Sequence, residues 1–312
     1  MTDSTQIKRA AEALIQGHLV AIPTETVYGL AANATDEHAI ARIYSVKGRP
    51  SNHPLIVHVS SFDAIHHWAH DIPEYVHFLA RDFWPGPMTL VLKRSELAQD
   101  FVTGGQDTVA VRVPAHPVAN ELLREYENLG GFGIAAPSAN RFGKVSPTSA
   151  KAVQTELGAY LDPSDLILDG GSSAVGIEST IIDCTGEAPR VLRLGAVTPS
   201  MIVESAGLRL SHEESTIRVS GSLKSHYSPD AAVALDVEPQ PGDGLIALAK
   251  FETPVGVTRV AAPKTVTEYA AVLYSALRRA DELGLSRLVA ITPKDGELAL
   301  AIVDRLQRAS HK

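Results

Sequence analysis

Apolar positions along the first 205 residues alternate between helical stripes and short strand-like runs. Five apolar residues between positions 7 and 16 recur at the spacing of one helix face, and Gly17 follows as a C-terminal cap. Thr35 is placed to cap the helix that follows it. Helices are predicted over 7–16, 36–47, 62–70, 73–84, 117–125 and from Thr198-Pro199 onward. Strands are predicted at 19–22, 55–59, 88–92, 108–114, 134–138, 166–169, 180–183 and 191–194.

The order of these elements predicts an α/β fold in three segments. Helices and strands interleave without a strict strand–helix–strand rhythm, which favours a mixed sheet over a purely parallel one. Residues 1–205 carry these elements, whereas 206–229 are polar with no sustained period and are expected to form a linker. Residues 230–312 predict a small α/β unit. Its expected strands are 231–237, 244–249 and 287–293, and its helices are 267–281 and one that ends near 309.

Composition and charge narrow the class of protein. The 312 residues carry a formal charge of −8, which disfavours a chain that coats nucleic acid along its whole surface. Cys184 is the single cysteine, so an internal disulfide and a thiolate metal site are excluded. The N-terminus lacks a signal-peptide pattern, and no apolar run has the roughly 20 residues of a membrane helix. We therefore expect a soluble, cytoplasmic protein with no membrane contact.

Two loops free of acidic residues are candidates for anion binding. KGRPSNHPL (47–55) carries Lys47 and Arg49 in a stretch with no Asp or Glu from 38 to 62. A solvated turn with two surface cations is the ordinary alternative. APSANRFGKVSPTS (136–149) lies in a second acid-free stretch and offers short polar side chains, although turns use such residues for local caps. Together the two loops favour a shared anionic ligand.

Polar residues at strand ends add a second group of candidates. PTETVYGL (23–30) places Thr26 after an apolar strand, and GIESTIID (176–183) repeats the arrangement. Arg193 stands between two leucines of its predicted strand and is either an edge residue or directed at a ligand. The same two interpretations apply to Arg112 on the polar face of its alternating strand, where its planar fork suits a carboxylate or phosphate. GFGIAA lacks the strand–turn–helix context of a dinucleotide site, and no P-loop pattern occurs. Three histidines at 66, 67 and 70 lack carboxylates at ligand spacing, so a wet helix face is the preferred interpretation.

Seven motifs, taken in order, resemble the threonylcarbamoyl-adenylate synthase family, the YrdC-like group. They span residues 22–195 in the family's order: PTETVYGL, KGRPSNHPLIVHV, WPGPMTLVL, TVAVRVP, APSANRFGKVSPT, GIESTIID and VLRLG. SGSLKSHYSP and the C-terminal unit are similar to the longer, two-domain members. The resemblance implies a twisted, mixed, open α/β sheet around a large concave cleft, followed by a small Rossmann-like α/β domain. The implied boundaries are 1–205, a linker at 206–229, and 230–312.

The resemblance implies a nucleotidyltransferase that converts L-threonine, bicarbonate and ATP to threonylcarbamoyl-AMP and pyrophosphate. The product supplies the modified adenosine next to the tRNA anticodon through a separate tRNA threonylcarbamoyltransferase. Mg²⁺ is expected to arrive with ATP, and no protein side chain is expected to bind a metal. Weak binding of tRNA or other RNA is left open.

Site residues follow from the resemblance, position by position. Threonine is assigned to Thr26, His58, Arg112, the backbone of Ala136, and Ser179. ATP is assigned to Arg49, His53, Thr108, Ser138, Ser146, Arg193 and Tyr227. The catalytic group is Lys47, Arg49, Ser138 and Asn140.

Two positions depart from the family pattern, and two other functions stay open. Leu194 stands where proline is usual, and His53 stands where asparagine is frequent, which makes the nucleotide contact at 53 uncertain. One alternative is a structured-RNA-binding module without catalysis, which the net acidity disfavours. The other is a carbamoyl-adenylate-forming enzyme. The known examples carry zinc-finger and acylphosphatase-like modules that a 312-residue chain with one cysteine lacks.

Overall fold

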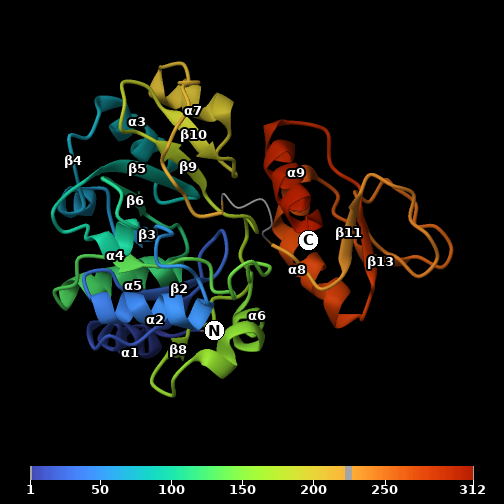
Figure 1. Ribbon diagram of the computed structural model, residues 1–312, viewed down its shortest axis with the longest axis horizontal. Helices are drawn as coiled ribbons and strands as arrows, with labels where there is room; N and C mark the ends of the chain where they lie inside the picture. Colours follow the sequence, from blue (N-terminus) through green and yellow to red (C-terminus); the bar gives the residue numbers. More distant parts are fainter. Residues whose placement is uncertain (1, 222–226, 312) are drawn as a thin grey trace.

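Two separate β-sheets organise the chain (Figure 1). The computed structural model describes residues 2–221 and 227–311. The larger sheet has the order β10-β9-β5-β6-β3-β7-β2-β1-β8, with β4 paired to β5. Its strands are β1 (Val20–Ile22), β2 (Gly29–Asn33), β3 (Ile56–His58), β4 (Ala69–His70), β5 (Met88–Arg94), β6 (Thr108–Arg112), β7 (Ile134–Ala135), β8 (Leu166–Ile167), β9 (Thr180–Asp183) and β10 (Arg190–Arg193).

The larger sheet is mixed, as the sequence pattern predicted. β3 pairs with β6 in parallel and β5 pairs with β9 in parallel, whereas β5 and β6 run antiparallel. The helices of this part are α1 (Ser4–Ile15), α2 (Glu37–Lys47), α3 (Glu74–Phe83), α4 (Asp100–Thr103), α5 (Pro117–Asn128), α6 (Ala150–Leu157) and α7 (Pro199–Ala206), with the 3₁₀ turns η1 (Asp63–His67) and η2 (Gly158–Tyr160).

A second, smaller unit contains the four-stranded sheet β11-β14-β12-β13, in which every pair is parallel. Its strands are β11 (Ala232–Leu235), β12 (Gly244–Ile246), β13 (Thr258–Ala261) and β14 (Arg287–Ala290), and its helices are α8 (Val266–Glu282) and α9 (Glu297–Ser310). The sequence pattern missed β13. Helices α8 and α9 lie on the side of this unit that faces the larger sheet (Figure 1).

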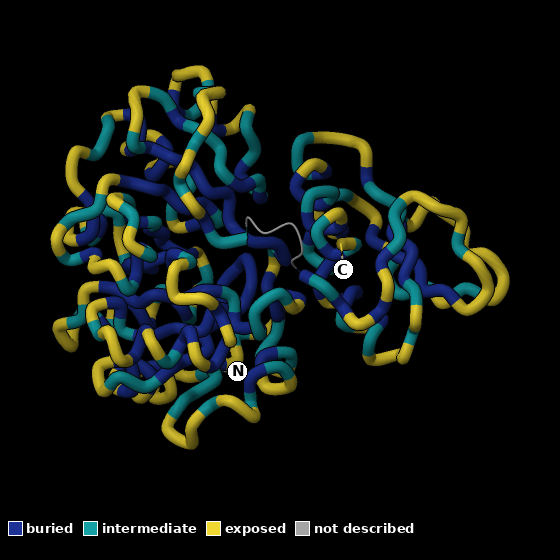
Figure 2. Tube along the Cα trace, in the orientation of Figure 1, coloured by how far each residue is buried: buried dark blue, intermediate teal, exposed yellow. Residues whose placement is uncertain are grey.

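Buried residues follow the strands of the larger sheet (Figure 2). Strand alternation divides their side chains between two layers of core. In β1, Ala21 packs into the core that α2 and α3 share, whereas Val20 and Ile22 pack against α1 and α5. Further along the sheet, Ile56, Val91 and Ile181 point to a face that carries no such helix core. The cavity described below opens on that face.

The segment after α7 covers part of this face, although its sequence is mostly polar. Ile217 and Val219 pack against Ile56, Val91 and Ile181. Arg218 donates a backbone hydrogen bond to the side chain of Gln106, which fixes the segment beside β6. Two apolar residues therefore hold this stretch of the expected linker on the sheet, while Thr216 and Arg218 beside them stay exposed.

Two local predictions were wrong. The helix expected over 62–70 is the turn η1 followed by β4, which pairs antiparallel with β5. Ile65 and Trp68 are three residues apart, a spacing that a 3₁₀ turn buries on one side, and the edge of β5 then takes the next two residues. The cap of α2 is Asp36, whose carboxylate accepts from two helix amides, while Thr35 bonds to Asn33 instead.

Within the described residues no helix combines the length and the apolar character needed to cross a bilayer. The same residues contain no group of three or more His, Cys, Asp or Glu that could hold a metal ion.

Candidate active site

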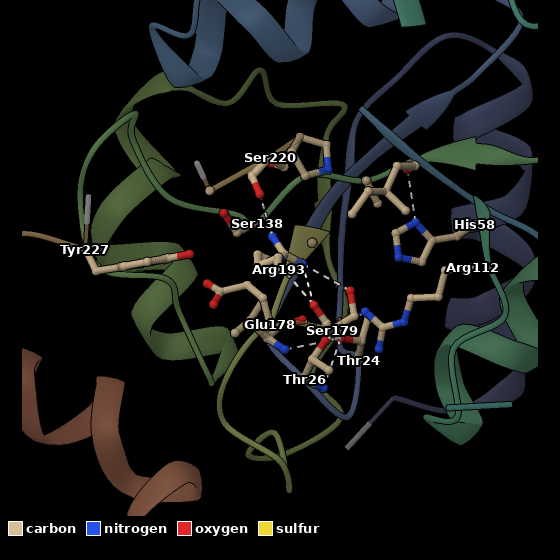
Figure 3. A pocket seen from close by; sticks show the side chains of 16 residues that line it. Thr24, Thr26, His58, Arg112, Ser138, Glu178, Ser179, Arg193, Ser220 and Tyr227 are labelled. Carbon is tan, nitrogen blue, oxygen red and sulfur yellow. Dashed lines mark hydrogen bonds between the residues drawn. The ribbon is translucent and has the colours of Figure 1, made fainter. Parts of the chain in front are cut away.

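A cavity of about 40 Å³ lies where the strand ends of the larger sheet meet the segment after α7 (Figure 3). Gly29 lets β2 approach the 136–138 loop closely, because a Cβ there would lie 3.2 Å from the Ala136 Cβ. The lining residues include eight of the predicted site residues: Thr26, His58, Arg112, Ala136, Ser138, Ser179, Arg193 and Tyr227. Residues far apart in sequence therefore converge on one cavity.

Arg112 reaches the cavity from the end of β6 and is held by three bonds. Its Nε donates to Gly86 O (3.1 Å) and its Nη1 to Thr26 Oγ1 (2.9 Å). Thr26 Oγ1 lies 2.8 Å from Thr24 Oγ1, and Thr24 in turn donates to Val27 O (2.6 Å). Because the Thr24 hydrogen is committed to that carbonyl, Thr26 must donate to Thr24, and a directed chain runs from the guanidinium to the backbone.

Glu25 completes this end of the cavity. Its Oε1 lies 2.5 Å from Arg112 Nη2, and its Oε2 accepts from the Ala115 amide at 3.0 Å. Burial raises the pKa of the Glu25 carboxyl, but Arg112 outweighs this effect and holds the pKa below its usual value. The carboxylate stays charged and balances the guanidinium, while each terminal nitrogen of Arg112 keeps one hydrogen for a ligand.

His58 lies beside Arg112, its partner in the register of β3 and β6, and is neutral (Figure 3). Burial, with Arg112 nearby, lowers the pKa of His58 to about 3. Its Nδ1 lies 3.2 Å from Ile56 O, and since a carbonyl can only accept, Nδ1 carries the hydrogen. The Nε2 lone pair is therefore left to accept a hydrogen bond from a ligand O–H or N–H.

Arg193 lines the cavity beside Ser220, and Arg49 contacts the Ser220 side chain without lining the cavity itself; both therefore contact the segment after α7. Arg193 donates to Ser179 O (2.9 Å) and to Ser220 O (2.8 Å). Arg49 donates to Pro54 O (2.8 Å) and, from both terminal nitrogens, to Ser220 Oγ (3.3 Å). Burial lowers the pKa of Arg49 to about 10 and also lowers the pKa of Arg193.

These two guanidiniums have no carboxylate in salt-bridge range among residues 2–221 and 227–311. Arg49 Nε is also buried without a hydrogen-bond partner in that part of the chain. Glu178, which lines the same cavity, raises the pKa of Arg193 from a longer distance but does not offset the effect of burial. A buried cation without a full counter-ion is costly, and an anionic ligand would remove that cost. This side of the cavity is therefore suited to a phosphate group.

Lys47 and Asn140 lie behind the cavity wall. Lys47 is 2% exposed, and its Nζ donates to the carbonyls of Ser138 and Asn140, each at 2.5 Å. Burial lowers the pKa of Lys47 well below its ordinary value. Asn140 donates its side-chain amide to Arg141 O and Lys144 O. Both residues hold the 138–144 loop in shape from beneath.

Three further predicted residues are not among those that line the cavity. Thr108 lines a separate small cavity beneath Ile217 and Val219. His53 packs its ring edge against Phe142 (5.4 Å between centroids). Ser146 is fully buried, and its hydroxyl lies 2.7 Å from Glu178 Oε1.

Sequence reasoning assigned no role to two carboxylates, Glu25 and Glu178, or to Ser220. Glu25 and Glu178 both stand among hydroxyl residues at strand ends, which is the signal that could have drawn attention to them. Ser220 lies in a polar stretch with no comparable signal.

Fold and site together define a class of protein. Proteins of this class have a mixed α/β sheet with a cavity at its strand ends, followed by a small parallel α/β unit. At the cavity one arginine forms an ion pair with a carboxylate and two arginines form none within the described residues. Two family models match the chain: the one described as "Telomere recombination" over residues 12–195, and "Threonylcarbamoyl-AMP synthase, C-terminal domain" over 191–311. The chain belongs to the threonylcarbamoyl-AMP synthase family.

Individual relatives agree with this assignment. The threonylcarbamoyl-AMP synthase of Pyrococcus abyssi is 40% identical over 326 residues, covering 98% of this chain and 94% of that protein. The Bacillus subtilis enzyme is 36% identical over 332 residues, covering 99% and 94%. The crystal structure of P. abyssi Sua5 complexed with L-threonine superposes with a TM-score of 0.88 at 38% identity, covering 99% of this chain and 95% of that one.

Proposed function

We propose that this protein is an L-threonylcarbamoyladenylate synthase. It condenses L-threonine, bicarbonate and ATP into threonylcarbamoyl-AMP, with pyrophosphate and water as the other products. Family membership supports the reaction. The observation that carries the assignment to this cavity is its charge arrangement: Arg112 is paired with Glu25, whereas Arg49 and Arg193 have no carboxylate in salt-bridge range among the described residues.

Threonine binds at the Arg112 end of the cavity. The two remaining guanidinium hydrogens of Arg112 receive its carboxylate, since an arginine fork matches a carboxylate in geometry. Neutral His58 offers its Nε2 lone pair to the threonine hydroxyl or amine. Thr26, Ser179 and the backbone of Ala136 complete this subsite. The threonine complex of P. abyssi Sua5 supports the choice of amino acid.

ATP, with its Mg²⁺ as part of the substrate, binds at the Arg49 and Arg193 end. Both guanidiniums exchange their bonds to Ser220 for bonds to phosphate oxygens. Ser138 lines the cavity between the two ends, and Lys47 and Asn140 keep its loop in place from below. The further nucleotide contacts assigned by resemblance are His53, Thr108, Ser146 and Tyr227.

The chemistry needs positioning and charge neutralisation more than a protein nucleophile. The amine of threonine, in its unprotonated form, adds to the carbon derived from bicarbonate and forms a carbamate. A carbamate oxygen then attacks the α-phosphorus, and the bond to the pyrophosphate oxygen breaks. Holding a short-lived carbamate in line with ATP lowers the activation barrier by placing the reacting atoms together. Arg49 and Arg193 neutralise the negative charge that develops as pyrophosphate leaves.

Residues 217–221 must leave the cavity before ATP binds. Ser220 occupies the donors of both guanidiniums, and about 40 Å³ is far below the roughly 300 Å³ of an ordinary small-molecule site. We assign residues 1–205 to the catalytic domain, 206–229 to the linker and 230–312 to a C-terminal domain that covers the cleft and retains the unstable product. The product then passes to a separate tRNA threonylcarbamoyltransferase.

Pyrophosphate release, measured with each substrate omitted in turn, tests this function. The purified protein is expected to release pyrophosphate only when L-threonine, bicarbonate and ATP are all present. Equal release without threonine or without bicarbonate would refute the proposed reaction.

A further inference from the structure

A buried carboxylate joins the active-site cavity to the C-terminal unit. Glu178 precedes β9, lines the cavity, and is 7% exposed. Its Oε1 lies 2.7 Å from Ser146 Oγ, on the catalytic side. Its Oε2 lies 2.7 Å from the Tyr274 hydroxyl of α8 and 3.4 Å from Arg305 Nε of α9. One side chain thus contacts a predicted nucleotide residue and both helices of the C-terminal unit.

The contact between the two units is close-packed around this carboxylate. Ile177, the residue before Glu178, packs into the core of α8 and α9 together with Val27 and Val145. Gly176 is so close to α8 that a Cβ would lie 2.5 Å from Ala270 O and from Ala271 Cα. Because atoms this closely packed cannot move independently, a shift of α8 or α9 must also move Glu178.

The same network fixes the orientation of the Ser146 hydroxyl. Burial raises the pKa of Glu178, but Arg305 and Arg193 outweigh it and lower the pKa to about 2, so the carboxylate is ionised and can only accept. Ser146 must therefore donate its single hydrogen to Glu178. Toward a ligand the Ser146 oxygen can only accept, which suits a ribose hydroxyl or an amino group and not a phosphate oxygen.

Tyr227 extends the network to the cavity wall. Its ring stacks on Tyr274, with 5.2 Å between centroids and 28° between planes, and it lines the cavity beside Glu178 (Figure 3). Arg305 is 1% exposed, and apart from Glu178 the carboxylate that it contacts among the described residues is its neighbour Asp304. Its buried charge is therefore compensated from two sides, by Glu178 at the cavity and by Asp304 on its own helix.

We propose that Glu178 is a positioning residue that couples nucleotide binding to docking of the C-terminal unit. Docking places Arg305 and Tyr274 on the carboxylate, the carboxylate orients Ser146, and Ser146 accepts from the nucleotide. Each event then favours the other, as binding linkage requires. The proposal rests on the proposed function for the identity of the nucleotide as ATP.

Three variants and one matched control test the coupling, with ATP affinity measured by calorimetry without turnover. Glu178→Gln keeps the shape and removes the charge, and is expected to weaken ATP binding about tenfold. Tyr274→Phe, which removes one hydroxyl and keeps the ring stack, is expected to weaken it about threefold. The double variant is expected to match Glu178→Gln alone, because both changes break one network.

Glu156→Gln is the matched control. Glu156 pairs with Arg278 of α8 at 3.1 Å across the same contact between units, yet it does not line the cavity. It is expected to change ATP affinity less than about twofold, since it lies outside the network. An equal loss in Glu156→Gln and Glu178→Gln, or additive losses in the double variant, would overturn the proposal.

Hydrogen exchange separates coupling from simple loss of a contact. Saturating ATP is expected to slow amide exchange in α8 and α9 of the natural protein, and to slow it markedly less in Glu178→Gln at the same site occupancy. Equal protection in both would refute the coupling. If Glu178→Gln does not fold, Tyr274→Phe carries the same two measurements. Because neither measurement uses product formation, failure of the synthase reaction would be recognised separately.

Discussion

The cavity contains two kinds of buried arginine, and they differ in how their charge is balanced. In the paired half, Arg112 faces Glu25 at 2.5 Å and is ordered by a chain of threonine hydroxyls. In the unpaired half, Arg49 and Arg193 bond to carbonyl and hydroxyl oxygens, and neither has a carboxylate in salt-bridge range in residues 2–221 and 227–311. Glu178 acts on Arg193 only from a longer distance. All three side chains are less than 10% exposed.

The difference matches the two substrates. A paired half with no net charge suits zwitterionic threonine, which also has none. An unpaired half with two positive charges suits a triphosphate. The same difference predicts opposite effects on the free energy of unfolding. Removing Arg112 leaves the buried Glu25 carboxylate without its partner and should destabilise the fold, whereas removing Arg49 eliminates a buried charge that no ion pair compensates and should not.

The largest expected effect comes from Arg112→Ala. Glu25 would remain buried without its partner, so the free energy of unfolding should fall by about 3–5 kcal/mol. Loss of the carboxylate clamp should lower kcat/KM for threonine at least about a hundredfold, since a bidentate charged contact is worth roughly 1.5–3 kcal/mol and misplacement adds to the loss. ATP affinity, measured by calorimetry, should change far less.

Arg81→Ala is the control for this prediction. Arg81 also pairs with a carboxylate, Asp82, but its side chain is 67% exposed. Its removal should leave both stability and threonine use nearly unchanged, because solvent screens an exposed pair. Unchanged threonine dependence in Arg112→Ala would remove Arg112 from the substrate clamp.

The Glu25–Arg112 pair also predicts a pH dependence. The pKa of Glu25 is lower in the folded protein than its ordinary value of 4.5, so the pair stabilises the fold fully above that value. As pH falls below 4.5 toward the lower folded pKa, this contribution is lost. The difference in unfolding free energy between the natural protein and Glu25→Gln should therefore be constant near neutrality and shrink below pH 4.5; a difference that does not shrink would contradict the assignment.

A smaller effect, with the opposite sign for stability, is expected for Arg49→Met. Methionine fills similar space without a charge, so the free energy of unfolding should stay level or rise by about 1 kcal/mol. ATP affinity should fall about 10- to 100-fold, because charged hydrogen bonds contribute about 1.5–3 kcal/mol. Thermal unfolding and calorimetry on one sample measure both. A clear loss of stability in this variant would show that the two halves do not differ as described.

Sequence reasoning succeeded where local pattern and motif agreed. Alternation in β6 placed Arg112 on the face opposite its valines, and motif order brought Thr26, His58 and Ser179 to one cavity. The mixed sheet followed from the irregular order of helices and strands. The structure shows that Thr26, His58, Arg112 and Ser179 line one cavity. The roles of these residues in binding stay predictions.

Pairings between distant segments could not be predicted from pattern alone. Glu25 and Arg112 are 87 residues apart, and Glu178 and Arg305 are 127 apart, so each pair depends on strand register and on how the two units dock. The burial of Ile217 and Val219 was missed for a related reason: two apolar residues in a polar stretch carry no period. The false helix over 62–70 shows the reverse error, in which neighbouring β5 decided the local structure.

The smallest predicted effect sharpens the description of the unpaired half. Ser220 Oγ accepts two long bonds from Arg49, at 3.3 Å each, while the bond from Arg193 goes to the Ser220 backbone. Ser220→Ala therefore removes only the bonds to Arg49 that ATP must displace, and ATP should bind about two- to threefold more tightly, a gain of about 0.5 kcal/mol. Ser215→Ala, in the same segment but bonded to the Ile217 amide, should leave ATP affinity unchanged. If Ser220→Ala weakens ATP binding instead, then Ser220 itself contacts the nucleotide, and its hydroxyl does not compete with the phosphates for Arg49.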